Sequence, residues 1–145
     1  MKKVLICFLF TLCLTGCIVR NEDFESTCEV NKNSENISDN MSIHVTYDNE
    51  DNVKEAIVTH TYKALNDEGK TILEEIKTSA TSFNEKYAGN ENIKITVAKD
   101  EEDEWQLKYY LDVPNLDNDV LNEFMLRKNS VRFFNKMRDQ NIECD

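Results

Sequence analysis

The sequence predicts an α+β domain in which two hairpins flank a long helix and build an antiparallel sheet of four or five strands, followed by two short C-terminal helices. Three observations predict this fold. Apolar residues alternate with polar ones at 41–47 and again at 105–113, and they recur at helical spacing between 67 and 88. A layout of this kind places the helices on one face of the sheet.

The first hairpin is predicted over residues 41–64. Its first strand has the period of a strand with one buried face, carried by Met41, Ile43, Val45 and Tyr47. Residues 48–52 form a turn of acidic and amide side chains. Residues 53–64 are rich in β-branched and aromatic side chains, which favour the return strand.

A long helix is predicted from residue 67 to residue 88. Asn66 or Asp67 can cap its N-terminus, and it ends just before Gly89, a residue that favours the left-handed conformation after a helix. Its apolar residues form one stripe, which should cover the sheet. The stripe consists of Ile72, Leu73, Ile76, Ala80, Phe83 and Tyr87.

The second hairpin pairs a strand at 93–97 with one at 105–113 across an acidic turn at 99–104. Trp105 and Tyr109 share the buried parity of their strand, so we interpret them as core residues, although such rings could also stack on a sugar or a peptide. The opposite face of the sheet should be polar and exposed. It would carry Ser42, His44, Thr46, Gln106, Lys108, Tyr110 and Asp112.

Two short helices are predicted after Pro114, which ends the return strand because proline cannot donate a ladder hydrogen bond. Asp117 can cap the first helix, and Asn129 or Ser130 the second. Asn141 can adopt the left-handed conformation that ends a helix.

The first sixteen residues are predicted to be a signal peptide. A positive head precedes an apolar run at 4–14, which is too short to span a bilayer of roughly 30 Å. The segment 14–17 (LTGC) resembles the lipobox of bacterial lipoproteins, which implies cleavage between Gly16 and Cys17 and lipid on the Cys17 thiol. Acyl chains there would anchor the protein to the outer face of the bacterial cytoplasmic membrane. The alternative is a plain secretory signal, or a cysteine that stands at this position by chance.

The predicted organisation is therefore a lipoprotein signal peptide at 1–16, a lipidated cysteine with a tether at 17–27, and a single extracytoplasmic α+β domain at 28–145. The tether is polar and acidic. A strand opens at Cys28. Residues 31–40 show no hydrophobic periodicity and are predicted to form a loop.

The chain is acidic, with 28 Asp and Glu against 17 Lys and Arg in 145 residues and a formal net charge of −11. Removal of Lys2 and Lys3 with the signal peptide would leave −13, since 15 basic residues remain against 28 acidic ones. Nucleic acid is excluded as an expected partner, because phosphates are bound by clustered Lys and Arg. A basic envelope protein or peptide would be attracted.

Two of the five cysteines remain after processing. Cys7 and Cys13 leave with the signal peptide and Cys17 carries lipid, so Cys28 and Cys144 are predicted to form one structural disulfide. The alternatives are two free thiols or a redox or metal-binding pair. A redox-active pair is disfavoured, because the sequence contains no Cys-x-x-Cys motif.

Catalytic and metal-binding patterns are not found in the sequence. His44 lies on the polar face of its predicted strand, and His60 is half-buried and faces Asn40 rather than His44. There is no Gly-x-Ser-x-Gly motif. The acidic runs at 48–51 and 100–104 lack the glycine of an EF-hand loop. We therefore expect no enzyme, no cofactor, no catalytic residue and no metal site.

Three stretches resemble the YehR-like family of small uncharacterised bacterial lipoproteins. They are the lipobox at 14–17, the hairpin VTYDNEDNVKEAIVTHTY at 45–62 and the segment EKYAGNENIKITV at 85–97. The resemblance covers residues 41–113. It implies a membrane-anchored extracytoplasmic domain, and it supplies no activity and no catalytic residues.

These observations predict a non-enzymatic binding or envelope-maintenance lipoprotein. The alternative is a lipoprotein that binds a small ligand or a cation at a site between the helix 67–88 and the sheet. A sizeable pocket lined by Tyr62, Tyr87 or Tyr109 would favour the small-ligand alternative. A closed core would favour interaction with another protein.

Overall fold

The computed structural model describes residues 22–145. The predicted signal peptide, its cleavage site at Gly16 and Cys17, and the first part of the tether lie outside the described residues. The predicted α+β class is confirmed, with elements in the order β1 (Phe24–Asn33), β2 (Ile37–Tyr47), β3 (Val53–Ala64), α1 (Asp67–Lys86), β4 (Ile93–Asp100), β5 (Glu104–Asp112), a 3-10 turn (Val113–Asn115), α2 (Asn118–Glu123) and α3 (Ser130–Asp139).

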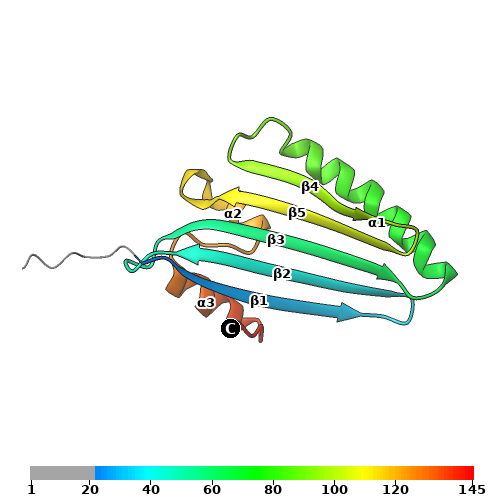
Figure 1. The fold of residues 1–145 in the computed structure, drawn as a ribbon, viewed down its shortest axis with the longest axis horizontal. Coiled ribbons are helices and arrows are strands. Elements are labelled where there is room, and N and C mark those ends of the chain that lie inside the picture. Colours follow the sequence, from blue (N-terminus) through cyan, green and yellow to red (C-terminus); the bar gives the residue numbers. More distant parts are fainter. Residues whose placement is uncertain (1–21) are drawn as a thin grey trace, which may run out of the picture.

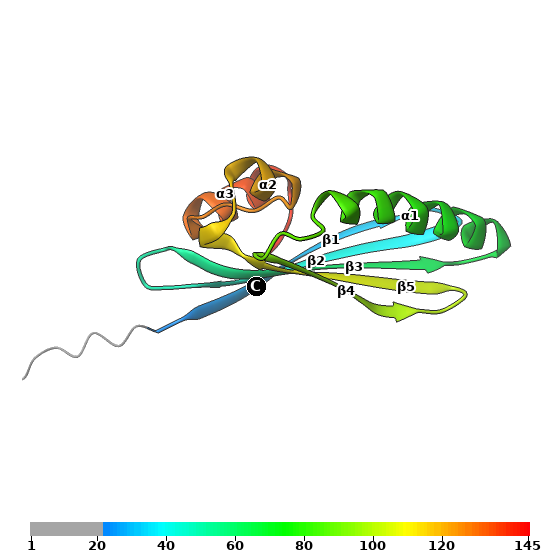
Figure 2. The ribbon, with the colours of Figure 1, turned by 90° about the horizontal axis from the view of Figure 1, so that it is seen from above.

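The five strands form one antiparallel sheet in the order β1-β2-β3-β5-β4. Because β3 pairs with β5, α1 leads from β3 to the edge strand β4, and β5 returns between them. All three helices lie on the same face of the sheet (Figures 1 and 2). Figure 2 shows α1 over one half of that face, and α2 and α3 over the other.

The β1–β2 connection is shorter than predicted. Strand pairing continues to Asn33 and resumes at Ile37, so the predicted loop at 31–40 is wrong, and the predicted tether at 17–27 extends at most to Asp23. The turn is closed by a hydrogen bond from the Ser34 backbone N–H to the Ile37 carbonyl, 2.9 Å long. Backbone pairing suffices to form this exposed polar ladder, so no apolar pattern marks it.

The other strands follow the prediction closely. The turn at 48–52 is present, with Asp51 at a φ of 63°. His60 pairs with Met41, one residue from the predicted Asn40. β4 extends to Asp100, beyond the predicted end at residue 97.

Two of the three predicted helix N-caps are present, and α1 ends at Lys86, two residues before the predicted end. The Asn66 side chain accepts a hydrogen bond from the Gly69 backbone N–H at 2.8 Å, and Asn129 caps α3 through the Arg132 backbone N–H. Asn141 has the predicted left-handed conformation, with a φ of 57°. Asp117 stands at the start of α2 without a side-chain cap hydrogen bond. No helix within residues 22–145 is both long enough and apolar enough to cross a membrane.

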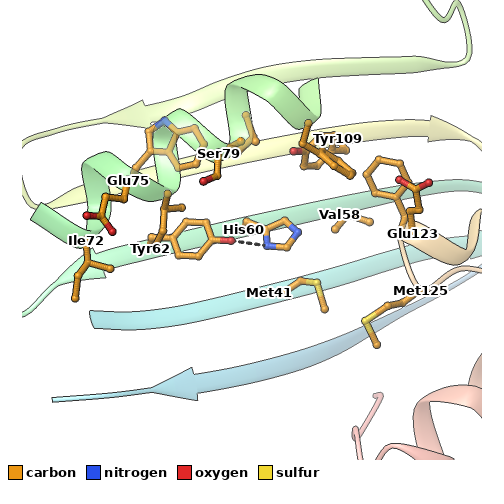
Figure 3. A pocket seen from close by; sticks show the side chains of 16 residues that line it. Met41, Val58, His60, Tyr62, Ile72, Glu75, Ser79, Tyr109, Glu123 and Met125 are labelled. Atoms are coloured by element: carbon orange, nitrogen blue, oxygen red, sulfur yellow. Dashed lines mark hydrogen bonds between the residues drawn. The ribbon is translucent and has the colours of Figure 1, made fainter. Parts of the chain in front are cut away.

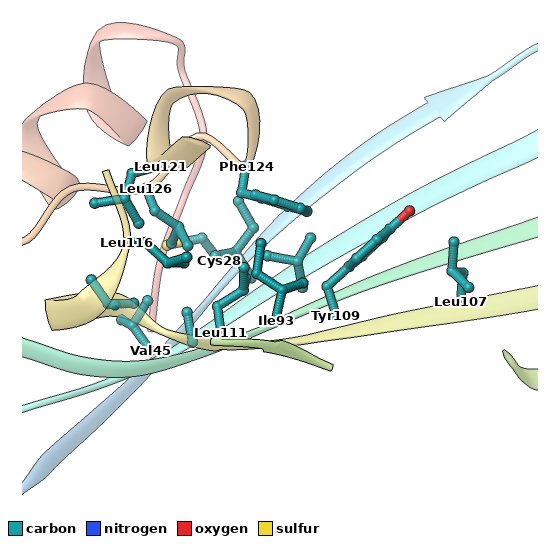
Figure 4. Close-up of a cluster of buried hydrophobic side chains, with 14 of the residues drawn as sticks. Cys28, Val45, Ile93, Leu107, Tyr109, Leu111, Leu116, Leu121, Phe124 and Leu126 are labelled. Carbon is teal, nitrogen blue, oxygen red and sulfur yellow. The ribbon is translucent and has the colours of Figure 1, made fainter. Parts of the chain in front are cut away.

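The half of the sheet under α2 and α3 is closed by a dense apolar core (Figure 4). Large side chains from the C-terminal region meet the inner faces of β2 and β3, and all of them are buried. They include Ile43, Val45, Val53, Leu121, Leu126, Phe133 and Met137.

The predicted disulfide between Cys28 and Cys144 is present, and Cys28 is fully buried. It fixes the end of the described chain against β1. The Asp145 backbone N–H donates to the Thr27 carbonyl at 3.1 Å, and the Thr27 N–H donates to the Asp145 carboxylate at 2.7 Å. The C-terminal residues therefore bond to the edge strand β1. They belong to the closed half, by which we mean the half of the sheet beneath α2 and α3 and the core between them.

Candidate ligand-binding pocket

A pocket of about 590 Å³ lies between α1 and the sheet (Figure 3). Its floor comes from β2, β3 and β5, its roof from α1, and one end from the last residue of α2 and the two residues that follow it. Figure 3 shows Ile72, Glu75 and Tyr62 at one end of the pocket, and Glu123 and Met125 at the other. It is therefore elongated along the strands.

Strand register brings four aromatic rings together on the floor. His60 and Tyr62 are two residues apart on β3, so they project from the same face, and Tyr62 pairs with Trp105 on the neighbouring strand β5. The Tyr62 ring lies 6.0 Å from Trp105 and 6.0 Å from His60, nearly parallel to both. Tyr109 meets His60 edge-on at 6.1 Å. We call Trp105, Tyr62, His60 and Tyr109 the aromatic row.

The roof leaves space above this row. Only Gly69 and Leu73 of the twenty residues of α1 are buried, whereas Ile76, Ala80 and Phe83 of the predicted apolar stripe are half-buried. Ser79 and Ala80 are the smallest of the six α1 side chains that line the pocket. A gap remains between the helix and the sheet, and protein interiors leave few such voids without a reason.

The N-terminal end of α1 is held tightly against the β1–β2 turn. A Cβ added at Gly69 would lie 2.0 Å from the Asn36 carbonyl oxygen, so only glycine permits this approach. The same carbonyl accepts a hydrogen bond from the Leu65 N–H at 2.8 Å, and the Asn66 amide donates to the Asn36 side chain at 2.9 Å.

The C-terminal end of α1 is held by aromatic contacts. The Phe83 ring lies 5.8 Å from Phe124 and 6.0 Å from Tyr109. The Tyr109 hydroxyl donates a hydrogen bond to Asn84 Oδ1 at 2.8 Å. α1 is thus fixed at both ends, and the pocket is the space between the helix and the floor.

The interior polar groups of the pocket are neutral near pH 7. The Tyr62 hydroxyl and His60 Nδ1 are hydrogen-bonded at 3.3 Å. Burial lowers the pKa of His60 and raises the pKa of Tyr62 to about 12, with the nearby Asp39 carboxylate adding to the rise. Burial also raises the pKa of Tyr109. The floor therefore offers ring faces and hydroxyl groups without a formal charge.

The charged groups of the pocket are carboxylates at its rim. Glu75 and Glu123 are both exposed, and none of the described residues that line the pocket is Lys or Arg. Glu123 accepts hydrogen bonds from the Lys86 ammonium and the Tyr87 hydroxyl, which hold the pKa of that carboxyl below its usual range. Both charged side chains that line the pocket are therefore acidic.

The sequence-predicted aromatic residues fall mostly in this site. Tyr62 and Tyr109, two of the three tyrosines whose place in a pocket would favour the small-ligand alternative, line it, whereas Tyr87 packs at the end of α1 outside it. Trp105 and Tyr109 are buried as core residues, 5% and 4% exposed, and they also line the pocket.

His44 is placed on the opposite, polar face of the sheet. Its Nδ1 lies 3.0 Å from the Thr27 hydroxyl, and its Nε2 lies 3.9 Å from a carboxylate oxygen of Glu25. His60 is half-buried on the helix-bearing face, as predicted. The structure therefore does not bring the two histidines together.

The acidic runs serve turns and ion pairs. Asp48 Oδ1 accepts hydrogen bonds from the backbone N–H groups of Glu50 and Asn52, both at 2.9 Å, which closes the β2–β3 turn. In the β4–β5 turn, Asp100 pairs with Lys77 on α1. Within residues 22–145, no cluster of three or more His, Cys, Asp or Glu is arranged to hold a metal ion.

Several lining residues were not predicted from the sequence, namely Met41, Glu75, Glu123 and Met125. The position of Met41 could have been predicted. It has the buried parity of its strand, and the register set by the turn at 48–52 places it opposite His60 on β3. Met125 has no such signal. It follows α2 with a φ of 62°, and only the tertiary fold brings it to the end of the pocket.

Comparisons with known proteins support the fold and do not identify a function. No family model matches the chain, and no curated protein matches it either. A solved structure, described as the NMR structure of the protein from Streptococcus pneumoniae TIGR4, is similar with a TM-score of 0.52 and 13% sequence identity. The match covers 100% of this chain and 98% of that chain. Such a likeness shows a shared fold alone, and function has to be argued from the site.

Proposed function

We propose that this chain is a membrane-anchored extracytoplasmic lipoprotein whose domain binds a small, mostly apolar ligand in the pocket beneath α1. The observation that carries the proposal is the pocket itself, about 590 Å³ in volume and floored by the aromatic row. Small-molecule sites are typically concave spaces of roughly 300–1,000 Å³ with apolar walls and a few polar groups. A closed core would instead have favoured a role in protein interaction.

The walls suit a ligand of variable shape. Met41 and Met125 both line the pocket, and Figure 3 shows their side chains near each other. Methionine is flexible and polarisable, so it adapts to different apolar surfaces. Ile72, Ile76 and Phe83 are half-buried in the roof, which leaves apolar surface for a ligand to cover.

The chemistry of His60 supports binding rather than catalysis. A histidine that acts as general base in a nucleophilic triad is oriented by a carboxylate. The hydrogen-bond partner of His60 is instead the Tyr62 hydroxyl. We therefore assign these two side chains the role of hydrogen-bonding groups on the floor of a binding site.

The proposed membrane anchor rests on the sequence at 14–17 and on the resemblance to YehR-like lipoproteins. Labelled fatty acid should be incorporated into the wild-type chain and absent from a Cys17→Ser variant, which should also be lost from the membrane fraction. Undiminished labelling of the variant would contradict lipidation at Cys17.

Trp105 provides a direct test of the pocket, because it is the single tryptophan of the chain and lies on the floor. We expect hexanol, a small neutral amphiphile, to change the Trp105 emission saturably in the full chain displayed on phosphatidylcholine vesicles. Ala80→Phe should weaken this binding tenfold or more, because the added ring occupies the space beneath the middle of α1.

The matched control is Thr81→Phe, which adds a similar ring at the neighbouring exposed position of α1. It should leave the hexanol titration unchanged. Equal titrations for wild type and Ala80→Phe, or no saturable change in wild type, would contradict ligand binding in this pocket.

A further inference from the structure

The rim of the pocket has an uncompensated negative charge at the end formed by Ile72, Glu75 and Tyr62. Glu75 lines the pocket, and the ion pairs found within residues 22–145 do not include it. Figure 3 shows its carboxylate at the same end as the Tyr62 ring. A ligand at this end would therefore meet an acidic group without a basic neighbour already bound to it.

The lysines of α1 are engaged elsewhere. Lys77 contacts Asp100 at 2.8 Å and Glu74 at 3.0 Å. Lys70 pairs with Glu102, and Lys86 pairs with Glu123 at the far end of the pocket. Each of these three ammonium groups thus has at least one carboxylate partner, so none is poised to neutralise a ligand anion near Glu75.

The floor beside Glu75 also suits a cation. The Tyr62 and Trp105 rings lie side by side with their planes 21° apart, and both line the pocket. The faces of such rings attract ammonium and guanidinium groups, and tryptophan and tyrosine are the strongest aromatic partners for them. A carboxylate and two electron-rich rings at one end form a receptor for positive charge.

We propose that the ligand is an amphiphilic organic cation, whose apolar body lies along the aromatic row and whose ammonium or guanidinium group lies at Glu75. This inference rests on the function proposed above and names the ligand class. Anionic amphiphiles such as fatty acids would place a like charge beside Glu75, where the described lining residues supply no Lys or Arg. The net charge of −11 favours the same choice, because it attracts cations towards the domain.

A charge series with one apolar body tests the ligand class. Hexyltrimethylammonium, hexanol and hexyl sulfate would each be titrated below their micelle concentrations into the full chain on neutral phosphatidylcholine vesicles, with Trp105 emission as the readout. We expect the cation to bind most tightly and the sulfate most weakly. Added salt should reduce the advantage of the cation, because it screens exposed charges.

Glu75→Gln should lower the affinity for hexyltrimethylammonium by about fivefold, the scale of one exposed ion pair, and leave hexanol binding unchanged. Glu85→Gln is the matched control, since it removes the same charge from an exposed position of α1 outside the pocket. It should leave the preference for the cation intact.

The outcomes separate this inference from the proposed function. Saturable hexanol binding without a preference for the cation, or a preference that survives Glu75→Gln, would overturn the cationic ligand and leave a neutral ligand site. Absence of saturable binding for all three compounds would overturn the binding function itself. A preference for the sulfate would overturn the assignment of charge at this end of the pocket.

Discussion

The two halves of the helix-bearing face of the sheet are packed in different ways. α3 has ten residues and buries Ser130, Phe133 and Met137, whereas α1 is twice as long and buries only Gly69 and Leu73. In the closed half, large side chains of the C-terminal region pack against large side chains of the sheet. In the open half, the helix is held at its ends and leaves a pocket in between.

This difference indicates that the closed half stabilises the domain and that the open half, beneath α1, is available to a ligand. The closed half contains the disulfide and the fully buried Leu126, Phe133 and Met137. The open half has apolar and aromatic surface that the chain itself does not cover. If the closed half keeps the sheet folded, the open half is free to exchange a ligand, and changes in the two halves should have unequal effects on stability.

Removal of the disulfide should have the largest effect. Replacing both Cys28 and Cys144 by Ser opens a link with a sequence separation of 116 residues. Long loops gain much entropy when they are released in the unfolded chain, so we expect a loss of about 2–5 kcal/mol in the free energy of unfolding. Urea unfolding would measure it. A reducing agent should reproduce the loss in wild type and have no effect on the double variant; an unchanged urea midpoint would show that the link does not stabilise the closed half.

A matched pair of truncations compares the halves directly. Leu126→Ala removes a fully buried side chain from the closed half and should cost about 3 kcal/mol, through lost burial and a new cavity. Ile76→Ala removes a half-buried side chain that already borders a pocket, so we expect a cost of about 1 kcal/mol or less. Both are read from urea unfolding curves. Equal costs would contradict the proposed division between the halves.

Gly69→Ala tests how the roof of the open half is anchored. The new methyl group would overlap the Asn36 carbonyl, and because both are backbone-fixed, the first turn of α1 must move away from the β1–β2 turn. We expect a loss of about 1–3 kcal/mol, the usual range for overpacking, and a weaker response of Trp105 to hexanol. Thr71→Ala, at an exposed position of the same helix, should change stability by less than about 0.5 kcal/mol. A neutral Gly69→Ala would mean that the helix start is not held at this point.

The sequence predicts most of the fold because the relevant signals are local. Alternation at 41–47 and 105–113 determines which residues face the helices, and the short turn at 48–52 sets the register to within one residue at His60. The polar hairpin around Ser34 was not predicted, because its strands are stabilised by backbone pairing and carry no apolar pattern.

The pocket is only partly predictable for a different reason. Its tyrosines are visible as the aromatic residues of two strands, and its place between helix and sheet was one of the expected alternatives. Its volume depends on the tertiary packing of α1, which is fixed near Gly69 and Phe83 and carries the small side chains of Ser79 and Ala80 in the roof. Met125 enters the site only through tertiary structure, whereas Glu75 lies at helical spacing from Ile72 and Ser79 but interrupts the apolar stripe, so the apolar pattern does not mark it.

The smallest expected effect is the contribution of His60 to the pH dependence of stability. Burial lowers its pKa from the ordinary value of 6.5, so below that pH the unfolded chain binds a proton that the folded domain resists. This contribution is fully present above pH 6.5 and is lost as the pH falls towards the lowered value. Urea midpoints measured on either side of pH 6.5 should therefore decrease less on acidification in His60→Gln than in wild type. Because His60 is only half-buried in the open half, its contribution should be smaller than the cost of any change described above. Identical slopes for the two proteins would show that ligand-accessible water already solvates the imidazolium in the empty pocket, and the floor would then have to be described as wet rather than apolar.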